Sequence, residues 1–321
     1  MPAPEETAKR PNAPAGIVVL NWNGWRDTIQ AVTAVRASTE RDILIYVVDN
    51  ASTDGSEAAL RAWDPTLTII QSGGNLGWAG GNNVGIRAAL RDGCAEVLLL
   101  NNDATPRPNT LKHLREAAQT LPRAAALGAM IVDSRDPGRV EFGGGYIDRR
   151  TGMPRQIHGR LETLDIPREP VSIAAVKGCA MLLTSVGLER VGLLTEDYFL
   201  NFDETDWCYR ARAAGLENYL VAQAVVDHQG AVSFGGTEGP MYGYFIARNR
   251  LVFAHRHLDR RGLWFAWRGA FWDFRRALSK TGGRGPGARL RHGATILLAV
   301  TDYLRGRLGD CPPLVRAWNR R

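Results

Sequence analysis

The sequence predicts an α/β protein with a mostly parallel central sheet and helices on both of its faces. Two observations predict this class. Short, almost continuously apolar runs alternate with helix-like stretches in the first third of the 321-residue chain, and polar clusters follow these runs. The composition, with 45% hydrophobic and 23% charged residues, is that of an ordinary globular protein, so a globally disordered chain is excluded.

The elements follow one another in a regular order. Residues 1–15 contain four prolines and no apolar periodicity, so we expect a flexible leader, and they lack the apolar segment of a secretory signal. Buried strands and helices then alternate. The predicted strands cover residues 17–20, 43–48, 67–70 and 97–100, and the helices include residues 27–37 and 80–91.

The helix after the second strand has its own start signals. Ser52 or Thr53 can cap the first turn, and Asp54 and Glu57 would lie within it, where the helix dipole favours negative charge. We therefore expect this helix to begin just after residue 53.

Polar clusters mark one edge of the predicted sheet. They occupy residues 21–24, 49–52, 72–81 and 101–103, each directly after an apolar run. Parallel sheets bind polar ligands at the carboxyl ends of their strands, so these clusters predict a nucleotide-type site.

A dinucleotide site is the first alternative to weigh. Gly74 and Gly77 fit the end of a G-x-G-x-x-G pattern, but Ser72 stands where the first glycine belongs. Glu96, the acidic residue about 20 positions on, precedes a strand instead of ending one. A Walker loop is absent as well. These departures disfavour a dehydrogenase.

Two aspartates give a better account of the polar edge. Asp49 closes the second predicted strand and Asp103 closes the fourth. One carboxylate could accept hydrogen bonds from a base or ribose, while the other holds Mg²⁺ or Mn²⁺ against a diphosphate. The alternative is structural: Asp49 would serve an Asx turn and Asp103 would cap a loop before Pro106.

The order of four motifs makes the chain recognisable. VVLNWNG, VVDNASTDGS, NLGWAGGNNVGI and LLLNNDATP succeed one another, and this order resembles the inverting family 2 glycosyltransferases with a GT-A fold. The resemblance extends over about residues 16–258 and is greatest to the rhamnosyltransferase-like branch, which builds cell-surface polysaccharides. It implies a Rossmann-like, mostly parallel sheet within a catalytic domain of residues 16–240. The nucleotide-binding half would be residues 16–132 and the acceptor-binding half residues 133–240.

The resemblance also assigns residues to the donor site. The family's metal-binding Asp-x-Asp motif stands here as Asn101-Asn102-Asp103, which leaves Asp103 as its one carboxylate ligand. The base-contacting aspartate corresponds to Asp49. The remaining positions expected to line the sugar-nucleotide pocket are Asn21, Asn75, Asn82 and Asn102.

An acidic cluster downstream is expected to supply the catalytic base. Residues 202–210 read FDETDWCYR, which resembles the family's Glu-Asp-x-Asp segment and places the base on Glu204, with Asp203 as second choice. Inverting transfer needs one base near the acceptor hydroxyl, and three carboxylates within four residues are expected to raise one another's pKa. The acceptor-side residues implied are Asp206, Trp207 and Gly178. The alternative is an exposed acidic first turn of a helix over residues 203–214.

His228 is the second predicted metal ligand, beside Asp103. It follows the apolar strand 219–226, where the family often has a histidine, and Ser233 matches the serine found five residues later. Neutral imidazole can join a carboxylate on Mn²⁺. Without the resemblance, a lone histidine is more often structural.

Cys179 and Cys208 are expected to be buried and inert, and the spacing of the four cysteines disfavours a disulfide scaffold or zinc ribbon.

The basic character lies in the last quarter of the chain. The net charge is +7, and residues 241–321 hold 17 Lys and Arg against 4 Asp and Glu, a local balance of +13. No run is long and apolar enough to span a bilayer. We therefore expect a helical extension that contacts an anionic membrane. The alternatives are a homodimer interface and packing against the catalytic domain. Nucleic acid is not an expected partner. Six aromatics contribute to this prediction: Trp264, Phe265, Trp267, Phe271, Trp272 and Phe274.

Together these observations predict a metal-dependent inverting glycosyltransferase. The expected donor is dTDP-L-rhamnose, with a UDP-sugar as alternative, and the acceptor is a hydroxyl of a glycan or a lipid-linked acceptor. The expected location is cytoplasmic and peripheral, at the inner face of the cell membrane. A non-catalytic module that binds sugar nucleotides or carbohydrate is the competing reading. A glycoside hydrolase also pairs carboxylates but needs neither nucleotide pocket nor metal.

Overall fold

The structure is a computed structural model that describes residues 13–148, 151, 153–230, 239–279 and 285–319. Most of the predicted leader, residues 1–12, and the predicted Ser233 lie outside the described residues.

Four parallel strands form the first half of the central sheet, in the order β4-β1-β2-β3. Strands β1 and β4 are buried through their centres and β2 is buried in its second half, as the sequence predicts for a sheet covered on both faces, whereas the edge strand β3 is only partly buried. The register pairs Asn21 with Asp49, so the polar ends of the strands are level. The strands are β1 (Ala15–Asn21), β2 (Ile43–Asp49), β3 (Thr68–Gln71) and β4 (Glu96–Asn101).

The second half of the sheet is mixed. Strand β12 (Ala180–Leu183) runs antiparallel between β4 and β6 (Ala124–Asp133), and β13 (Glu217–His228) runs parallel to β6. The short β5 (Ala104–Pro106) pairs antiparallel with β13 and sets His228 opposite Ala104, next to Asp103. The strands at the periphery are β7 (Asp136–Phe142), β8 (Gly145–Ile147), β9 (Pro154–Gln156), β10 (Gly159–Arg160) and β11 (Val171–Ile173).

Helices cover the sheet as the alternating pattern predicts, and the predicted fold class is confirmed. One helix start was predicted wrongly: α2 begins at Ser56, after Gly55 in a left-handed conformation, and not just after residue 53. The reason is that Ser52 hydrogen-bonds with Asp49 and so is not free to cap. The helices of this part are α1 (Trp25–Arg36), α2 (Ser56–Trp63), α3 (Gly77–Arg91), α4 (Thr110–Thr120), α5 (Ser185–Val191) and α6 (Asp203–Ala213), with one-turn helices at η1 (Leu161–Thr163) and η2 (Glu196–Tyr198).

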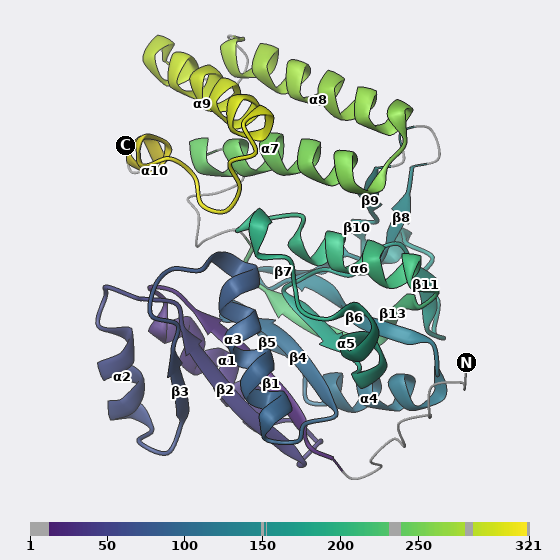
Figure 1. Cartoon of the computed structure of the whole chain (residues 1–321). Helices are drawn as coiled ribbons and strands as arrows, with labels where there is room; N and C mark the ends of the chain where they lie inside the picture. The colour runs from purple at the N-terminus through teal and green to yellow at the C-terminus, as the bar shows by residue number, and fades with distance from the viewer. Residues whose placement is uncertain (1–12, 149–150, 152, 231–238, 280–284, 320–321) are drawn as a thin grey trace, which may run out of the picture.

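Four C-terminal helices lie together beyond the carboxyl edge of the sheet (Figure 1). They are α7 (Pro240–His257), α8 (Arg260–Leu278), α9 (Pro286–Leu304) and α10 (Pro313–Asn319). Buried polar side chains of α7 attach this layer to the catalytic part. Asn249 Nδ2 donates to the carbonyl oxygens of Tyr198 and Leu200 at 2.9 and 2.7 Å, and Arg248 donates to Tyr198 O at 3.0 Å.

The aromatics of α8 divide between core and surface. Trp267 and Phe274 pack against buried residues of the helical layer, whereas Trp264, Phe271 and Trp272 are 56%, 55% and 53% exposed. Within the described ranges, no helix combines the length and apolar character needed to cross a membrane.

Candidate functional site

Asp49 sits in a hydrogen-bond network at the end of β2. Its Oδ1 accepts from Asn21 Nδ2 at 2.9 Å and from the Ser52 hydroxyl, and its Oδ2 accepts from Gln71 Nε2 at 3.0 Å. Asn21 is fully buried, and its Oδ1 accepts from Thr28 at 2.9 Å. Asn21 was predicted to line the sugar-nucleotide pocket, and its side chain is engaged in orienting Asp49.

A small hollow of about 70 Å³ opens at this edge of the sheet. Of the six residues predicted to bind the sugar nucleotide, Asn75 and Asn102 line it, whereas Asn21, Asp49, Asn82 and Asp103 do not. Asn82 is buried on α3, where its Nδ2 donates to Trp78 O at 2.9 Å and its Oδ1 has no hydrogen-bond partner among the described residues. The hollow is bounded by Leu20, Trp22, Asn50, Asn75, Gly77, Trp78, Asn101, Asn102, Phe199, Leu200, Met241 and Arg316.

Trp78 lines this hollow and was not among the site residues predicted from the sequence. Its Nε1 donates to Asn101 Oδ1 at 2.8 Å, and its backbone N–H donates to Phe199 O at 2.7 Å. Gly178 packs on its ring: a Cβ added there would lie 2.8 Å from Trp78 Cζ2. Gly178, which was predicted on the acceptor side, therefore leaves room for the indole of Trp78 at the hollow.

Asp103 and His228 come together as predicted, although 125 positions separate them in the sequence. His228 Nε2 lies 3.4 Å from Asp103 Oδ1, and both side chains are buried. The Oδ1 atom has no hydrogen bond from the described residues. A buried carboxylate oxygen left without a donor beside an imidazole suits a hard divalent cation.

Glu141 on β7 lies beside the pair formed by Asp103 and His228, and it was not predicted from the sequence. Its Oε2 lies 2.8 Å from His228 Nδ1. Burial lowers the pKa of His228, but the nearby carboxylates of Asp103 and Glu141 outweigh it and raise the pKa to about 9. Glu141 stands in no recognisable motif, and only strand register brings it here. Among the residues described, no three His, Cys, Asp or Glu side chains form a group that could hold a metal by themselves.

The acidic helix begins after a strained segment. Phe199, Asn201 and Phe202 all have positive φ, which is uncommon for residues other than glycine and concentrates at functional sites. Asp203 is 1% exposed and its Oδ2 has no partner among the described residues, whereas Glu204 is partly exposed. Burial and the neighbouring charge of Glu204 raise the pKa of Asp203 well above its usual range.

Asp206 and Trp207, which were predicted on the acceptor side, are both buried. Asp206 accepts from Thr195 at 2.7 Å, Tyr198 at 3.0 Å and Arg210 at 2.9 Å, and it pairs with His257 at 2.7 Å. Despite burial, these bonds hold the pKa of Asp206 below its usual range, not above it as the cluster argument predicts. Trp207 is fully buried and donates to Gly192 O at 2.8 Å. Both residues stabilise the fold behind the site.

Cys179 is a buried thiol that is influenced by carboxylates from both acidic groups, Asp103 with Glu141 and the helix residue Glu204. It is buried and free, as predicted, and burial raises its pKa to about 12. The negative charges of Asp103, Glu141 and Glu204 also raise this pKa, against the opposing charge of Lys177. These three carboxylates are thus near enough to the thiol to act on it electrostatically.

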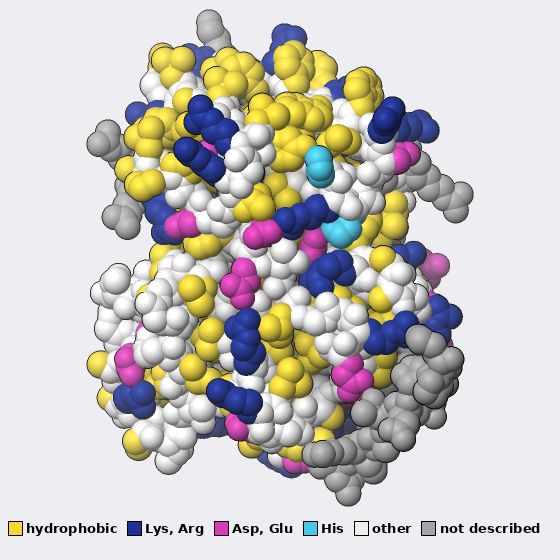
Figure 2. All heavy atoms as spheres, in the orientation of Figure 1, with side chains coloured by type: hydrophobic (Ala, Val, Ile, Leu, Met, Phe, Trp, Pro, Cys, Tyr) yellow, Lys and Arg dark blue, Asp and Glu magenta, His cyan; other side chains and the backbone are white. Residues whose placement is uncertain are grey.

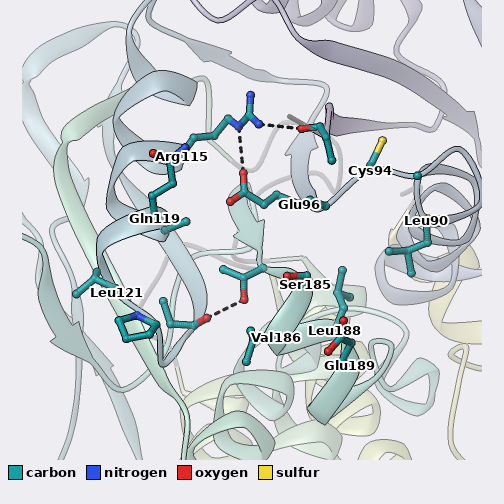
Figure 3. Close-up of a pocket in the computed structure, with 17 residues that line it drawn as sticks. Leu90, Cys94, Glu96, Arg115, Gln119, Leu121, Ser185, Val186, Leu188 and Glu189 are labelled. Carbon is teal, nitrogen blue, oxygen red and sulfur yellow. Dashed lines mark hydrogen bonds and ion pairs between the residues drawn. The ribbon is translucent and has the colours of Figure 1, made fainter. Parts of the chain in front are cut away.

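A larger cavity than this hollow lies elsewhere in the described residues. It measures about 590 Å³ and lies where β4 begins, at Glu96, whereas the predicted site lies where that strand ends (Figure 3). Glu96 is paired there with Arg115 at 3.1 Å, and Leu90 and Leu188 lie across the cavity. It contains none of the predicted site residues.

A parallel sheet with Asp49 and Asp103 at its carboxyl edge, followed by an acidic helix, defines a glycosyltransferase with a GT-A fold. The chain belongs to the family described as glycosyl transferase family 2, whose model matches residues 16–181.

Curated relatives agree with this family. The chain is 29% identical over 249 residues to the low-salt glycan biosynthesis hexosyltransferase Agl10 of Haloferax volcanii, covering 74% of each chain. It is 28% identical to an N-acetylglucosaminyl-diphospho-decaprenol L-rhamnosyltransferase of Mycobacterium tuberculosis, over 64% of this chain and 72% of that one. It is 21% identical to the dTDP-rhamnosyl transferase RfbF of Shigella flexneri, over 75% and 79%.

Solved structures share the fold. The mannosyltransferase PcManGT of Pyrobaculum calidifontis, solved with GDP-Man and Mn²⁺, is 16% identical with a TM-score of 0.54, covering 99% of this chain and 87% of its own. GalNAc-T7, solved with UDP, GalNAc and Mn²⁺, is 12% identical with a TM-score of 0.59, covering 92% and 58%.

Proposed function

We propose that this protein is a metal-dependent inverting glycosyltransferase that moves L-rhamnose from dTDP-L-rhamnose to a hydroxyl of a glycan or lipid-linked acceptor. The observation that carries the proposal is the approach of His228 Nε2 to the buried Asp103 Oδ1 at 3.4 Å, directly after Asn102, which lines the hollow. These two side chains provide a candidate cation site, and the partly exposed Glu204 at the start of α6 is the base candidate. Residues 16–132 would hold the nucleotide, residues 133–240 the acceptor, and residues 241–321 form the extension.

Asp103 and His228 are the residues that would hold Mn²⁺ or Mg²⁺. Their contact atoms lie 3.4 Å apart and supply two ligands, which suits cations that complete their shell with phosphate and water. When bound, the cation would offset the charge that develops on the leaving diphosphate. Glu141 orients His228 through Nδ1, as outer partners of metal-bound histidines commonly do.

Asp49, Asn75 and Asn102 would bind the nucleotide part of the donor. Asp49 is oriented by three side chains, and Asn75 Oδ1 is held by Gly77 N–H at 3.0 Å. Side chains fixed in this way select strongly between nucleotides, because a nucleotide that cannot hydrogen-bond with them leaves buried polar atoms without partners.

The donor assay tests this proposal. Purified protein is incubated with Mn²⁺, a diphospholipid-linked acceptor sugar and, in parallel, dTDP-L-rhamnose or a set of UDP-sugars, and release of the nucleoside diphosphate is measured. We expect dTDP release that depends on the acceptor. Two relatives named as rhamnosyltransferases support this choice. Acceptor-dependent UDP release alone would replace the rhamnosyl donor with a UDP-sugar.

The C-terminal helices would bring the site to the inner face of the cell membrane. Figure 2 shows hydrophobic and basic side chains intermingled over these helices. The guanidinium of Arg268 lies 5.7 Å from the ring of Trp264, and that of Arg275 lies 5.9 and 5.6 Å from Phe271 and Trp272. Aromatic rings beside cations are suited to the headgroup region of an anionic bilayer.

Liposome flotation tests this contact. The full chain should float with phosphatidylglycerol vesicles and less so in high salt, because each basic residue near the surface adds about 1 kcal/mol. Replacing the exposed Trp264, Phe271 and Trp272 together with Gln should reduce flotation several-fold. Tyr146→Gln removes a similarly exposed ring from β8 and serves as the control. A full-length chain that stays with the soluble fraction at low salt would contradict the membrane contact and favour a homodimer interface.

A further inference from the structure

The geometry points to a donor-binding residue at the C-terminal end of the chain: we propose that the guanidinium of Arg316 contacts the diphosphate of the nucleotide donor. This inference rests on the proposed function. It concerns a residue far outside the segment matched by the family model, which ends at residue 181.

Arg316 differs in charge from everything else around the donor hollow. The other eleven lining residues are apolar side chains, glycine and amides, so Arg316 is the one charged side chain among the described lining residues. It shares this lining with Asn102, the neighbour of Asp103 in the chain. A diphosphate held by a cation at Asp103 would thus lie next to the hollow that Arg316 borders.

The fold holds Arg316 in this place. Helix α10 packs against α7 through Val315, which is fully buried, and Asn319 Oδ1 accepts from the Met241 N–H at 3.2 Å. The guanidinium carbon lies 5.7 Å from the centre of the Phe199 ring. The ring of Phe199 in turn stacks on Phe245 of α7, with 5.4 Å between centres. The arginine therefore reaches the hollow from a rigid support.

The chemistry of the group suits the proposed ligand. Arginine presents five N–H donors in a planar fork that matches phosphate oxygens, and it stays charged at every physiological pH. In the structure Arg316 pairs with Asp310, at a side chain 41% exposed, and the arginine itself keeps 27% of its side-chain surface exposed. One edge of the fork can hold Asp310 while the other meets the ligand.

A structural role is the competing explanation. Arg316 could serve only to tie α10 to the loop at Asp310 and to cover Phe199. The two roles differ in what Asp310 does. If Arg316 binds the diphosphate, loss of Asp310 frees the guanidinium and leaves nucleotide affinity equal or higher. If the ion pair is the purpose, loss of either partner has the same effect.

Calorimetric titration of the full chain with dTDP, dTMP and thymidine in Mn²⁺ separates these roles. Arg316→Ala should weaken dTDP binding by about 10- to 100-fold, the usual range for a hydrogen bond to a charged group, and leave thymidine binding unchanged. Arg316→Lys should recover part of the loss, because it keeps the charge but not the fork. Asp310→Ala should bind dTDP at least as well as the wild type. Arg305→Ala, an exposed residue after α9, is the control and should bind normally.

Two results would overturn the inference. One is dTDP binding by Arg316→Ala at wild-type strength. The other is an equal loss in Asp310→Ala, which would show that the ion pair acts only structurally. A wild-type chain that binds neither dTDP nor UDP would instead remove the proposed function, and this inference with it.

Discussion

Replacing Glu204 with Gln is expected to lower the rate of sugar transfer by at least about 100-fold, the usual scale for loss of a general base. Gln keeps the size and hydrogen-bonding capacity of the side chain but cannot take the proton of the acceptor hydroxyl. Glu204 is the partly exposed carboxylate at the start of α6, whereas Asp203 and Asp206 are buried. Initial rates with saturating donor measure the loss, and dTDP affinity should barely change.

Asp203→Asn is the matched comparison for this variant. Burial and the neighbouring charge of Glu204 raise the pKa of Asp203, which disfavours the charged form that a base needs, and an amide keeps the size of the buried side chain. Its loss of rate should therefore be well below that of Glu204→Gln. Near-normal turnover in Glu204→Gln, with a large loss in Asp203→Asn, would move the role of base to Asp203.

Asp103→Ala is expected to abolish turnover that depends on a divalent cation while leaving the fold intact. Asp103 supplies the buried carboxylate oxygen that lacks a hydrogen bond, and its removal leaves His228 without a second ligand beside it. The same loss should follow when EDTA is added to the wild type, and Mn²⁺ should restore only the wild-type rate. Thermal unfolding checks that the variant is folded.

Asp227→Asn is the control for Asp103→Ala. Asp227 neighbours His228 in β13 but pairs with Arg107 at 3.0 Å, so its loss should leave transfer unchanged. A wild-type rate that EDTA does not alter would contradict the metal assignment, and so would full activity of Asp103→Ala.

The first half of the fold was predictable because each local signal agrees with the tertiary structure. The strand that ends at Asp49 is apolar nearly throughout, and the run that ends at Asn101 is too, so both can only be buried strands. The start of α2 was predicted wrongly because Ser52 had two possible uses, as a helix cap or as a partner of Asp49. Local sequence does not decide between them.

The site was predictable where a motif carries it and unpredictable where pairing between strands creates it. The closeness of Asp103 and His228 follows from the position of each at a strand end. The contact of Glu141 with His228 could not be predicted in this way. Glu141 lies on a separate strand, and the residues next to it in the sequence form no motif that indicates His228 as its partner. The pKa of Asp206 was predicted in the wrong direction because adjacent carboxylates suggest repulsion, whereas Arg210 supplies an opposite charge and both Arg210 and His257 contact the carboxylate.

The anomeric configuration of the product tests the central claim most directly. Wild-type protein is given dTDP-L-rhamnose, Mn²⁺ and a diphospholipid-linked acceptor, and the new glycosidic bond is examined by NMR through its one-bond carbon–hydrogen coupling at C1. A single displacement aided by one base inverts this carbon, so the account predicts a product with the configuration opposite to that of the donor. A product that retains the donor configuration would contradict it, because retention requires a different mechanism from the one built on Glu204.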